Sequence, residues 1–196
     1  MNFVEIGTCD YDTLIDSPYF DGKGIVVEPI KKYLDRLPKK ENVKYLNFAI
    51  DPSVSGNPTT KDMYIIPEDT PNVPAWTKSC NSLLDSHPTL EHFQYDHLVE
   101  KIPVSCVGLN ILYEEIDFMI HVLKIDTEGM DFSILKHWDF KSHRPLHIIF
   151  ESKLMNGDEL NYITNLLGFY KYTVYPDKSK DYNLTPYNHV AISDIL

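Results

Sequence analysis

Short apolar runs of strand length alternate with helical patterns along most of the chain. Apolar residues recur at helical spacing most clearly over 158–167, and shorter helices are predicted at 30–37 and 130–138. Strands that alternate with helices are typical of a parallel sheet covered on both faces. We therefore predict an α/β fold. The strand-like runs lie at about 3–6, 24–28, 44–50, 120–126, 146–151, 170–175 and 189–194.

Residues 52–103 interrupt this alternation. Five prolines punctuate the first part, from Pro52 to Pro74, and only 63–66 and 79–84 suggest regular structure. A long connection inside a compact fold is more often a lid or binding loop than idle chain. We predict a single domain over 1–196 in which 52–103 is a loop or lid. The alternative is that residues 52–103 are a surface insertion that the fold tolerates.

The composition is that of a globular domain without a nucleic-acid partner. The 196 residues include 18 Lys and Arg against 29 Asp and Glu, a formal net charge of −11. Binding through phosphates needs clustered basic residues, which this chain lacks, and no run is long enough to span a bilayer. The first residues lack the charged-then-apolar order of a signal peptide, so we expect a cytoplasmic location and no membrane partner.

Three of the strand-like runs end in a carboxylate, at Glu5, Glu28 and Asp126. The carboxyl ends of parallel strands share one edge of the sheet, where ligands bind. The pyrophosphate of NAD or FAD would need a loop of three glycines, but only Gly7 follows the first run, and Asp10 would repel phosphate. A cofactor with an ammonium and a sulfonium suits such an acidic loop. S-adenosylmethionine is a molecule of this kind.

Glu28 has the position of a ribose ligand. It follows Glu5 by 23 residues, near the spacing of about 20 at which a carboxylate ending the second strand binds ribose hydroxyls. Pro29 and the helix predicted after it favour this role. The alternative is a solvent-exposed Glu that only ends a strand.

Three segments resemble the FkbM family of S-adenosylmethionine-dependent methyltransferases. They are residues 3–7, residues 27–29 and, most specifically, Leu123-Lys124-Ile125-Asp126-Thr127-Glu128-Gly129. Their order and spacing also agree with the family. The resemblance implies a Rossmann-like class I methyltransferase fold. Such a fold has three αβα layers around a mostly parallel sheet of order 3-2-1-4-5-7-6, with strand 7 antiparallel.

The resemblance also implies roles for individual residues. Asp126 and Glu128 would be catalytic residues between the cofactor and the acceptor. In methyl transfer to a hydroxyl, positioning of the two reactants contributes most, and a base removes the hydroxyl proton. An alternative is that Asp126 or Thr127 caps the helix that begins near Gly129. The implied cofactor-binding residues are Glu5, Gly7, Thr8, Asp10, Glu28, Pro29, Asp51 and Asp126.

The acidic residues after the fourth and fifth parallel strands suggest a further hypothesis. Asp126, Glu128, Asp131 and Glu151 could gather around a divalent cation. Acidic side chains at strand ends are common without a metal, so we assign no metal ligand. The eight histidines form no metal-binding pair four residues apart on a convincing helix.

The three cysteines are Cys9, Cys80 and Cys106. Their number is odd and their spacing is wide, which fits neither a disulfide framework nor a zinc motif. We expect three buried or half-buried thiols.

The function predicted is an S-adenosylmethionine-dependent O-methyltransferase. Its partner would be a small-molecule or glycan acceptor: a hydroxyl of a sugar, a glycoconjugate or another small polar metabolite. The acidic net charge fits a neutral or cationic acceptor. One alternative is a degenerate methyltransferase fold that serves as a binding or structural module. Another, a nucleotide-dependent oxidoreductase, is disfavoured by the single glycine.

Overall fold

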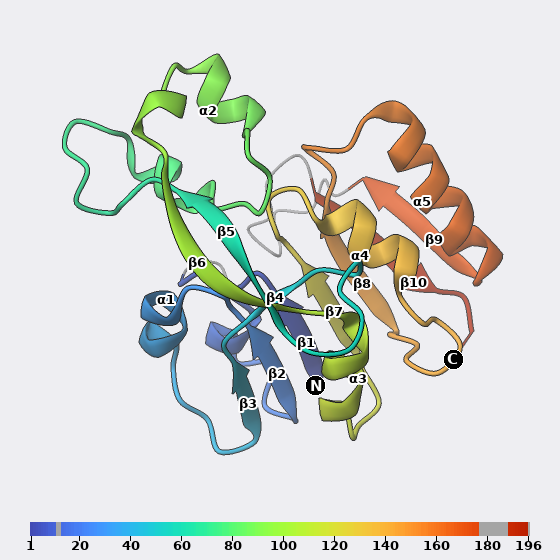
Figure 1. Ribbon diagram of the computed structural model, residues 1–196. Helices are drawn as coiled ribbons and strands as arrows, with labels where there is room; N and C mark the ends of the chain where they lie inside the picture. The colour runs from blue at the N-terminus through green and yellow to red at the C-terminus, as the bar shows by residue number, and fades with distance from the viewer. Residues whose placement is uncertain (11–12, 177–187, 196) are drawn as a thin grey trace.

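The computed structural model describes residues 1–10, 13–176 and 188–195 (Figure 1). Its largest element is a seven-stranded sheet. The strands are β1 (Phe3–Ile6), β2 (Gly24–Val27), β3 (Val43–Leu46), β7 (Val122–Ile125), β8 (His147–Glu151), β9 (Tyr172–Pro176) and β10 (Asn188–Ser193). They lie in the order β3-β2-β1-β7-β8-β10-β9. The first five are parallel, and β10 is antiparallel to both of its neighbours, so the predicted mostly parallel α/β sheet is confirmed.

Helices pack on both faces of this sheet. The helices α3 (Leu109–Glu115), α4 (Asp131–His137) and α5 (Gly157–Phe169) bury apolar side chains against one face. The opposite face packs against α1 (Lys31–Arg36) and the 3₁₀ helix η1 (Leu14–Asp16). Strands β1, β2 and β7 are therefore buried along their whole length, which explains their nearly continuous apolar runs.

The three predicted helices are confirmed within a few residues. The longest, α5, starts at a capping box in which the Asn156 side chain accepts from the N–H groups of Asp158 and Glu159. The Glu159 side chain accepts in turn from the N–H of Asn156 at 2.9 Å. The seven-residue helix α3 was not predicted, since it offers only two turns of apolar spacing.

The predicted strand 44–50 is wrong as one element. The chain leaves the large sheet after β3 and resumes as β4 (Ala49–Ile50) in a second sheet. The break lies at Asn47, whose side-chain amide donates to the carbonyls of Glu28 and Pro29, both at 2.9 Å. These contacts turn the chain out of the large sheet.

The excursion 52–103 is more regular than the sequence suggested. Its strand β5 (Thr59–Ile65) pairs antiparallel with β6 (Glu100–Val107), and β4 completes a three-stranded sheet of order β4-β6-β5. Most side chains of β5 and β6 are exposed or half-buried, so neither strand produces a continuous apolar run. The other elements of the excursion are η2 (Ala75–Ser79), α2 (Pro88–His92) and η3 (Asp96–Leu98).

The β5–β6 ribbon extends from the centre of the molecule, and α2 lies at the end of the ribbon that is farther from β4 (Figure 1). Among the helices of the described residues, none is long and apolar enough to cross a membrane.

Candidate functional site

The carboxyl ends of β1, β2 and β7 border a cavity of about 710 Å³, which includes its open mouth. Gly7, Glu28 and Asp126 line it from the large sheet, while Met63 and Leu83 line it from the excursion. Ligands of open α/β sheets bind at this place, outside the carboxyl ends of the strands. The structure therefore brings three predicted site residues to one cavity, with the excursion as its opposite wall.

Gly7 allows β1 and β7 to lie close together at the cavity. Its φ is +80°, in the left-handed region that favours glycine. A Cβ at this position would collide with the carbonyl oxygen of Asp126. The N–H of Gly7 donates to the carbonyl of Val27 at 2.9 Å, which holds the turn against β2. The single glycine of this loop thus stands where close packing requires one.

Glu28 is buried, with an exposed fraction of 4%, so the alternative of a solvent-exposed strand end is wrong. Its carboxylate accepts from the N–H groups of Cys9 and Ile30, each at 2.8 Å. Burial raises its pKa to about 7, against the lowering effect of these hydrogen bonds. A carboxylate offers about four acceptor positions, so two accepted bonds leave capacity for a ligand hydroxyl.

Thr8 and Pro29, two further residues predicted to bind the cofactor, also line the cavity. The Thr8 hydroxyl oxygen is buried, and it has no hydrogen-bond partner among the described residues. A buried hydroxyl normally has a partner. Thr8 therefore offers a donor and acceptor to a molecule in the cavity.

Asp126 lies at the end of β7, on the cavity wall. Burial is the main cause that raises the pKa of its carboxyl to about 7. Asp131, Glu128 and Glu5 contribute to this rise, and Lys124 opposes it. A group with this pKa can take up and release a proton near neutral pH.

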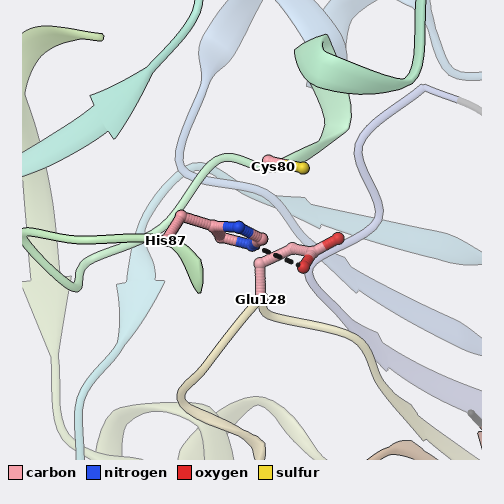
Figure 2. A group of neighbouring side chains, drawn as sticks. All are labelled: Cys80, His87 and Glu128. Carbon is pink, nitrogen blue, oxygen red and sulfur yellow. Dashed lines mark hydrogen bonds and ion pairs between the residues drawn. The ribbon is translucent and has the colours of Figure 1, made fainter. Parts of the chain in front are cut away.

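Glu128 is held in a left-handed conformation, with φ at +50°, which is uncommon for a residue other than glycine. Its carbonyl accepts a hydrogen bond from the Ser82 hydroxyl at 2.6 Å. Its carboxylate lies 3.0 Å from Nε2 of His87, which is buried in the excursion (Figure 2). Strained backbone of this kind persists where the surroundings enforce it, often at functional sites. The excursion thus holds Glu128 by both backbone and side chain.

His87 is a site residue that the sequence analysis missed. It lies 41 residues before Glu128, in a segment without helical or strand periodicity around it. Neither spacing nor a motif connects the two residues along the chain. Only the packing of the excursion against the β7–α4 loop brings them together.

The acidic residues form a smaller cluster than predicted. Carboxylate oxygens of Asp126, Glu128 and Glu151 lie within 4.8 Å of one another, and burial together with Glu128 and Asp126 raises the pKa of Glu151. Asp131 is instead used to hold the loop. It accepts from the Thr127 hydroxyl at 2.6 Å, from the Thr127 N–H at 3.1 Å and from the Glu151 N–H at 3.3 Å.

The interpretation of Asp126 or Thr127 as a helix cap is wrong. Helix α4 begins at Asp131, and its N-cap residue is Met130, which makes no side-chain capping bond. Capping of α4 therefore does not explain the presence of Asp126 and Glu128.

Three predicted cofactor-binding residues lie outside the cavity lining. Glu5 is fully buried on the α1 side of the sheet, where it pairs with Lys124 at 3.3 Å and accepts from the Leu14 N–H at 2.9 Å. The other two make ion pairs, Asp10 with a half-buried side chain and Asp51 with a buried one. A cofactor-binding role for all three stays a prediction. Asp10 pairs with Arg36 at 2.6 Å, and Asp51 pairs with Lys61 and accepts from Ser53.

The family comparison covers most of the chain. The model of the methyltransferase FkbM domain matches residues 5–182. No curated protein and no solved structure matches the chain.

Proposed function

The chain belongs to the FkbM methyltransferase family, and from this premise we propose that it transfers a methyl group from S-adenosylmethionine to a hydroxyl of a small polar acceptor. A sugar or a glycoconjugate is the acceptor class we favour. The observation that carries the proposal is the buried carboxylate of Glu28 on the wall of a cavity at the carboxyl ends of β1 and β2. The sheet order supports it, because class I methyltransferases have a sheet of this kind.

The residues of the cavity fit this cofactor. Glu28 has acceptor positions for ribose hydroxyls, Gly7 lines the cavity without a side chain, and the Thr8 hydroxyl has no hydrogen-bond partner among the described residues. Lining by apolar side chains such as Met63 and Leu83 suits an adenine ring. When bound, S-adenosylmethionine would supply an electrophilic methyl group.

Asp126 is our candidate for the general base. Its raised pKa, about 7, lets the ionised carboxylate accept the proton of an acceptor hydroxyl near neutral pH. Glu128 would orient the acceptor, since this residue lines the same cavity and its carboxylate is held by His87. Orientation is the larger contribution in an in-line displacement, and a positioned base typically adds a factor of about 10²–10⁴.

A second cavity, lined by residues of the excursion, suggests where a polar acceptor binds. It holds about 560 Å³, which includes its open mouth. His87 lines this cavity and contacts Glu128. Its wall contains hydroxyl and carboxylate groups, which bind neutral polyols or cations better than anions. They include Tyr64, Ser82, Asp85, Ser86, Glu91 and Asp96.

The test combines cofactor binding with turnover. S-adenosylmethionine and S-adenosylhomocysteine are titrated calorimetrically into the protein, and labelled methyl transfer is then measured on a panel of neutral and cationic hydroxyl acceptors. We expect micromolar binding and transfer to a hydroxylated acceptor. Cofactor binding without transfer to any acceptor would support the non-catalytic binding module. Binding of NAD in place of S-adenosylmethionine would refute the proposal.

A further inference from the structure

Three side chains of different chemistry meet where the excursion contacts the loop after β7 (Figure 2). Cys80 and His87 come from the excursion, and Glu128 comes from the loop between β7 and α4. One sulfur, one nitrogen and one oxygen of these residues lie within 4.8 Å of one another. Sulfur, imidazole nitrogen and carboxylate oxygen are the ligand types that zinc uses in proteins.

Two of the three residues are buried. Cys80 has an exposed fraction of 2% and His87 one of 5%. Nε2 of His87 contacts Glu128, but its Nδ1 is buried and has no hydrogen-bond partner among the described residues. The Cys80 sulfur has a weak contact, 3.8 Å long, with the Trp76 carbonyl. A buried polar atom normally has a hydrogen-bond partner, so the polar groups of Cys80 and His87 are incompletely satisfied by the described residues.

The backbone around the three residues is fixed by other contacts. Ser82, between Cys80 and His87, exchanges backbone hydrogen bonds of 2.8 and 3.1 Å with Tyr64 of β5. Its hydroxyl donates to the Glu128 carbonyl. These contacts hold the side chains near one another without a metal. Such outer contacts orient ligands in metal sites.

We propose that Cys80, His87 and Glu128 bind one divalent metal ion of the zinc class. Three protein ligands leave one position of a tetrahedral site open for water or a polar ligand atom. Cys80 and His87 both line the second cavity, which provides the space for that fourth ligand. The thiolate and imidazole favour Zn²⁺ over Mg²⁺ or Ca²⁺, which prefer oxygen ligands.

The metal would fasten the excursion to the β7–α4 loop. Two ligands come from the segment between η2 and α2, and the third comes from the loop that carries Asp126. Binding would therefore order the wall of both cavities. The proposal goes beyond methyl transfer and does not rest on it, because metal binding is measured without cofactor or acceptor.

The test uses the full chain after removal of metals by a chelator. Zn²⁺ is titrated in competition with a chromophoric chelator, and Co²⁺ is titrated separately to detect the charge-transfer absorption of a thiolate ligand. We expect one equivalent of each metal and a thiolate band. Both Cys80→Ser and His87→Gln should weaken binding by at least about 100-fold, since even outer-sphere substitutions cost 10–100-fold, and Cys80→Ser should abolish the band.

Cys106→Ser is the matched control, because Cys106 is also a buried thiol but lies in β6, outside the group. It should bind both metals as the unmodified protein does. Thermal melting of each variant identifies loss of folding. The proposal is overturned if the folded unmodified protein binds no stoichiometric metal. It is equally overturned if binding survives Cys80→Ser but is lost in Glu151→Gln, which would place the metal at the carboxylate cluster.

Discussion

The carbonyl oxygen of Asp126 occupies the space into which a side chain at Gly7 would extend. The two residues lie just beyond the ends of the neighbouring parallel strands β1 and β7, where the Asp126 N–H donates to the Ile6 carbonyl at 2.9 Å. This close approach sets the base of the cavity. It also explains why one glycine suffices in a loop that lacks the three glycines of a dinucleotide site.

We expect Gly7→Ala to destabilise the protein more than Gly56→Ala. Both glycines have similar positive φ values, +80° and +82°, so the conformational cost of a Cβ is shared. The Cβ at position 56 would meet no atom within 4 Å, whereas the Cβ at position 7 would collide with backbone. The extra cost should be about 1–3 kcal/mol, the range for overpacking. Denaturant unfolding of both variants measures it, and equal losses would contradict the close approach.

Glu28→Gln should weaken S-adenosylmethionine binding by about 10–100-fold. The change keeps the shape of the side chain but removes the charge, and hydrogen bonds to charged groups contribute about 1.5–3 kcal/mol. Calorimetric titration measures the loss. Glu41→Gln changes an exposed glutamate and serves as the control. This variant should bind S-adenosylmethionine as tightly as the unmodified protein.

The amide nitrogen that Glu28→Gln introduces cannot accept a hydrogen bond, so the variant loses one of the bonds donated by the N–H groups of Cys9 and Ile30. A melting temperature close to that of the unmodified protein would show that the fold tolerates this loss. Unchanged affinity in such a folded variant would remove Glu28 from the cofactor site.

Glu151→Gln should stabilise the protein, and by more as the pH rises. Burial and the neighbouring carboxylates raise the pKa of Glu151 to about 9 in the folded protein, so the folded state holds this proton more tightly than the unfolded state. The stability contributed by the protonated group is complete below about pH 4 and is lost as the pH rises towards 9. Gln has no proton to lose.

The expected gain at alkaline pH is on the order of 1 kcal/mol, which corresponds to about 2–4 °C in melting temperature for a chain of this length. Scanning calorimetry from acid to alkaline pH measures it. Glu114→Gln, an exposed glutamate of α3, should show no such trend. A difference between Glu151→Gln and the unmodified protein that does not change with pH would contradict the clustering of the three carboxylates.

The sequence predicted the parts of the site that follow from strand order. Glu28 and Asp126 end parallel strands, and parallel strands bring their carboxyl ends to one edge, so their convergence needed no tertiary information. Glu5 shows the limit of this argument. It precedes the end of β1 by one residue, and the alternation of side chains turns it to the opposite face, toward Lys124.

The contribution of the excursion could not be predicted. The segment from Cys80 to His87 contains an isolated bridge to Tyr64 and no longer periodic element, so no local pattern indicates which residues face inward. The contact between His87 and Glu128 depends on how the β5–β6 ribbon places this segment over the large sheet. A pairing of that kind is set by packing of distant elements, which spacing along the chain does not encode.

We expect the rate of methyl transfer to rise with pH through about 7. Asp126 must be ionised to accept a proton, and burial raises the pKa of its carboxyl to about 7. Asp126→Asn removes the base and keeps the size of the side chain. It should lower kcat by about 10²–10⁴, the usual contribution of a positioned base, and remove the rise with pH.

The comparison that decides this role is between kcat and cofactor affinity. If Asp126 acts on the acceptor proton, Asp126→Asn should change the dissociation constant of S-adenosylhomocysteine by less than about tenfold, since a neutral amide still offers one acceptor oxygen. Asp35→Asn, at an exposed ion pair of α1, controls for general effects of charge. A large loss of affinity with kcat unchanged at saturating cofactor would instead make Asp126 a cofactor ligand. In that case Glu128, on the same cavity wall and in contact with His87, would become the candidate base.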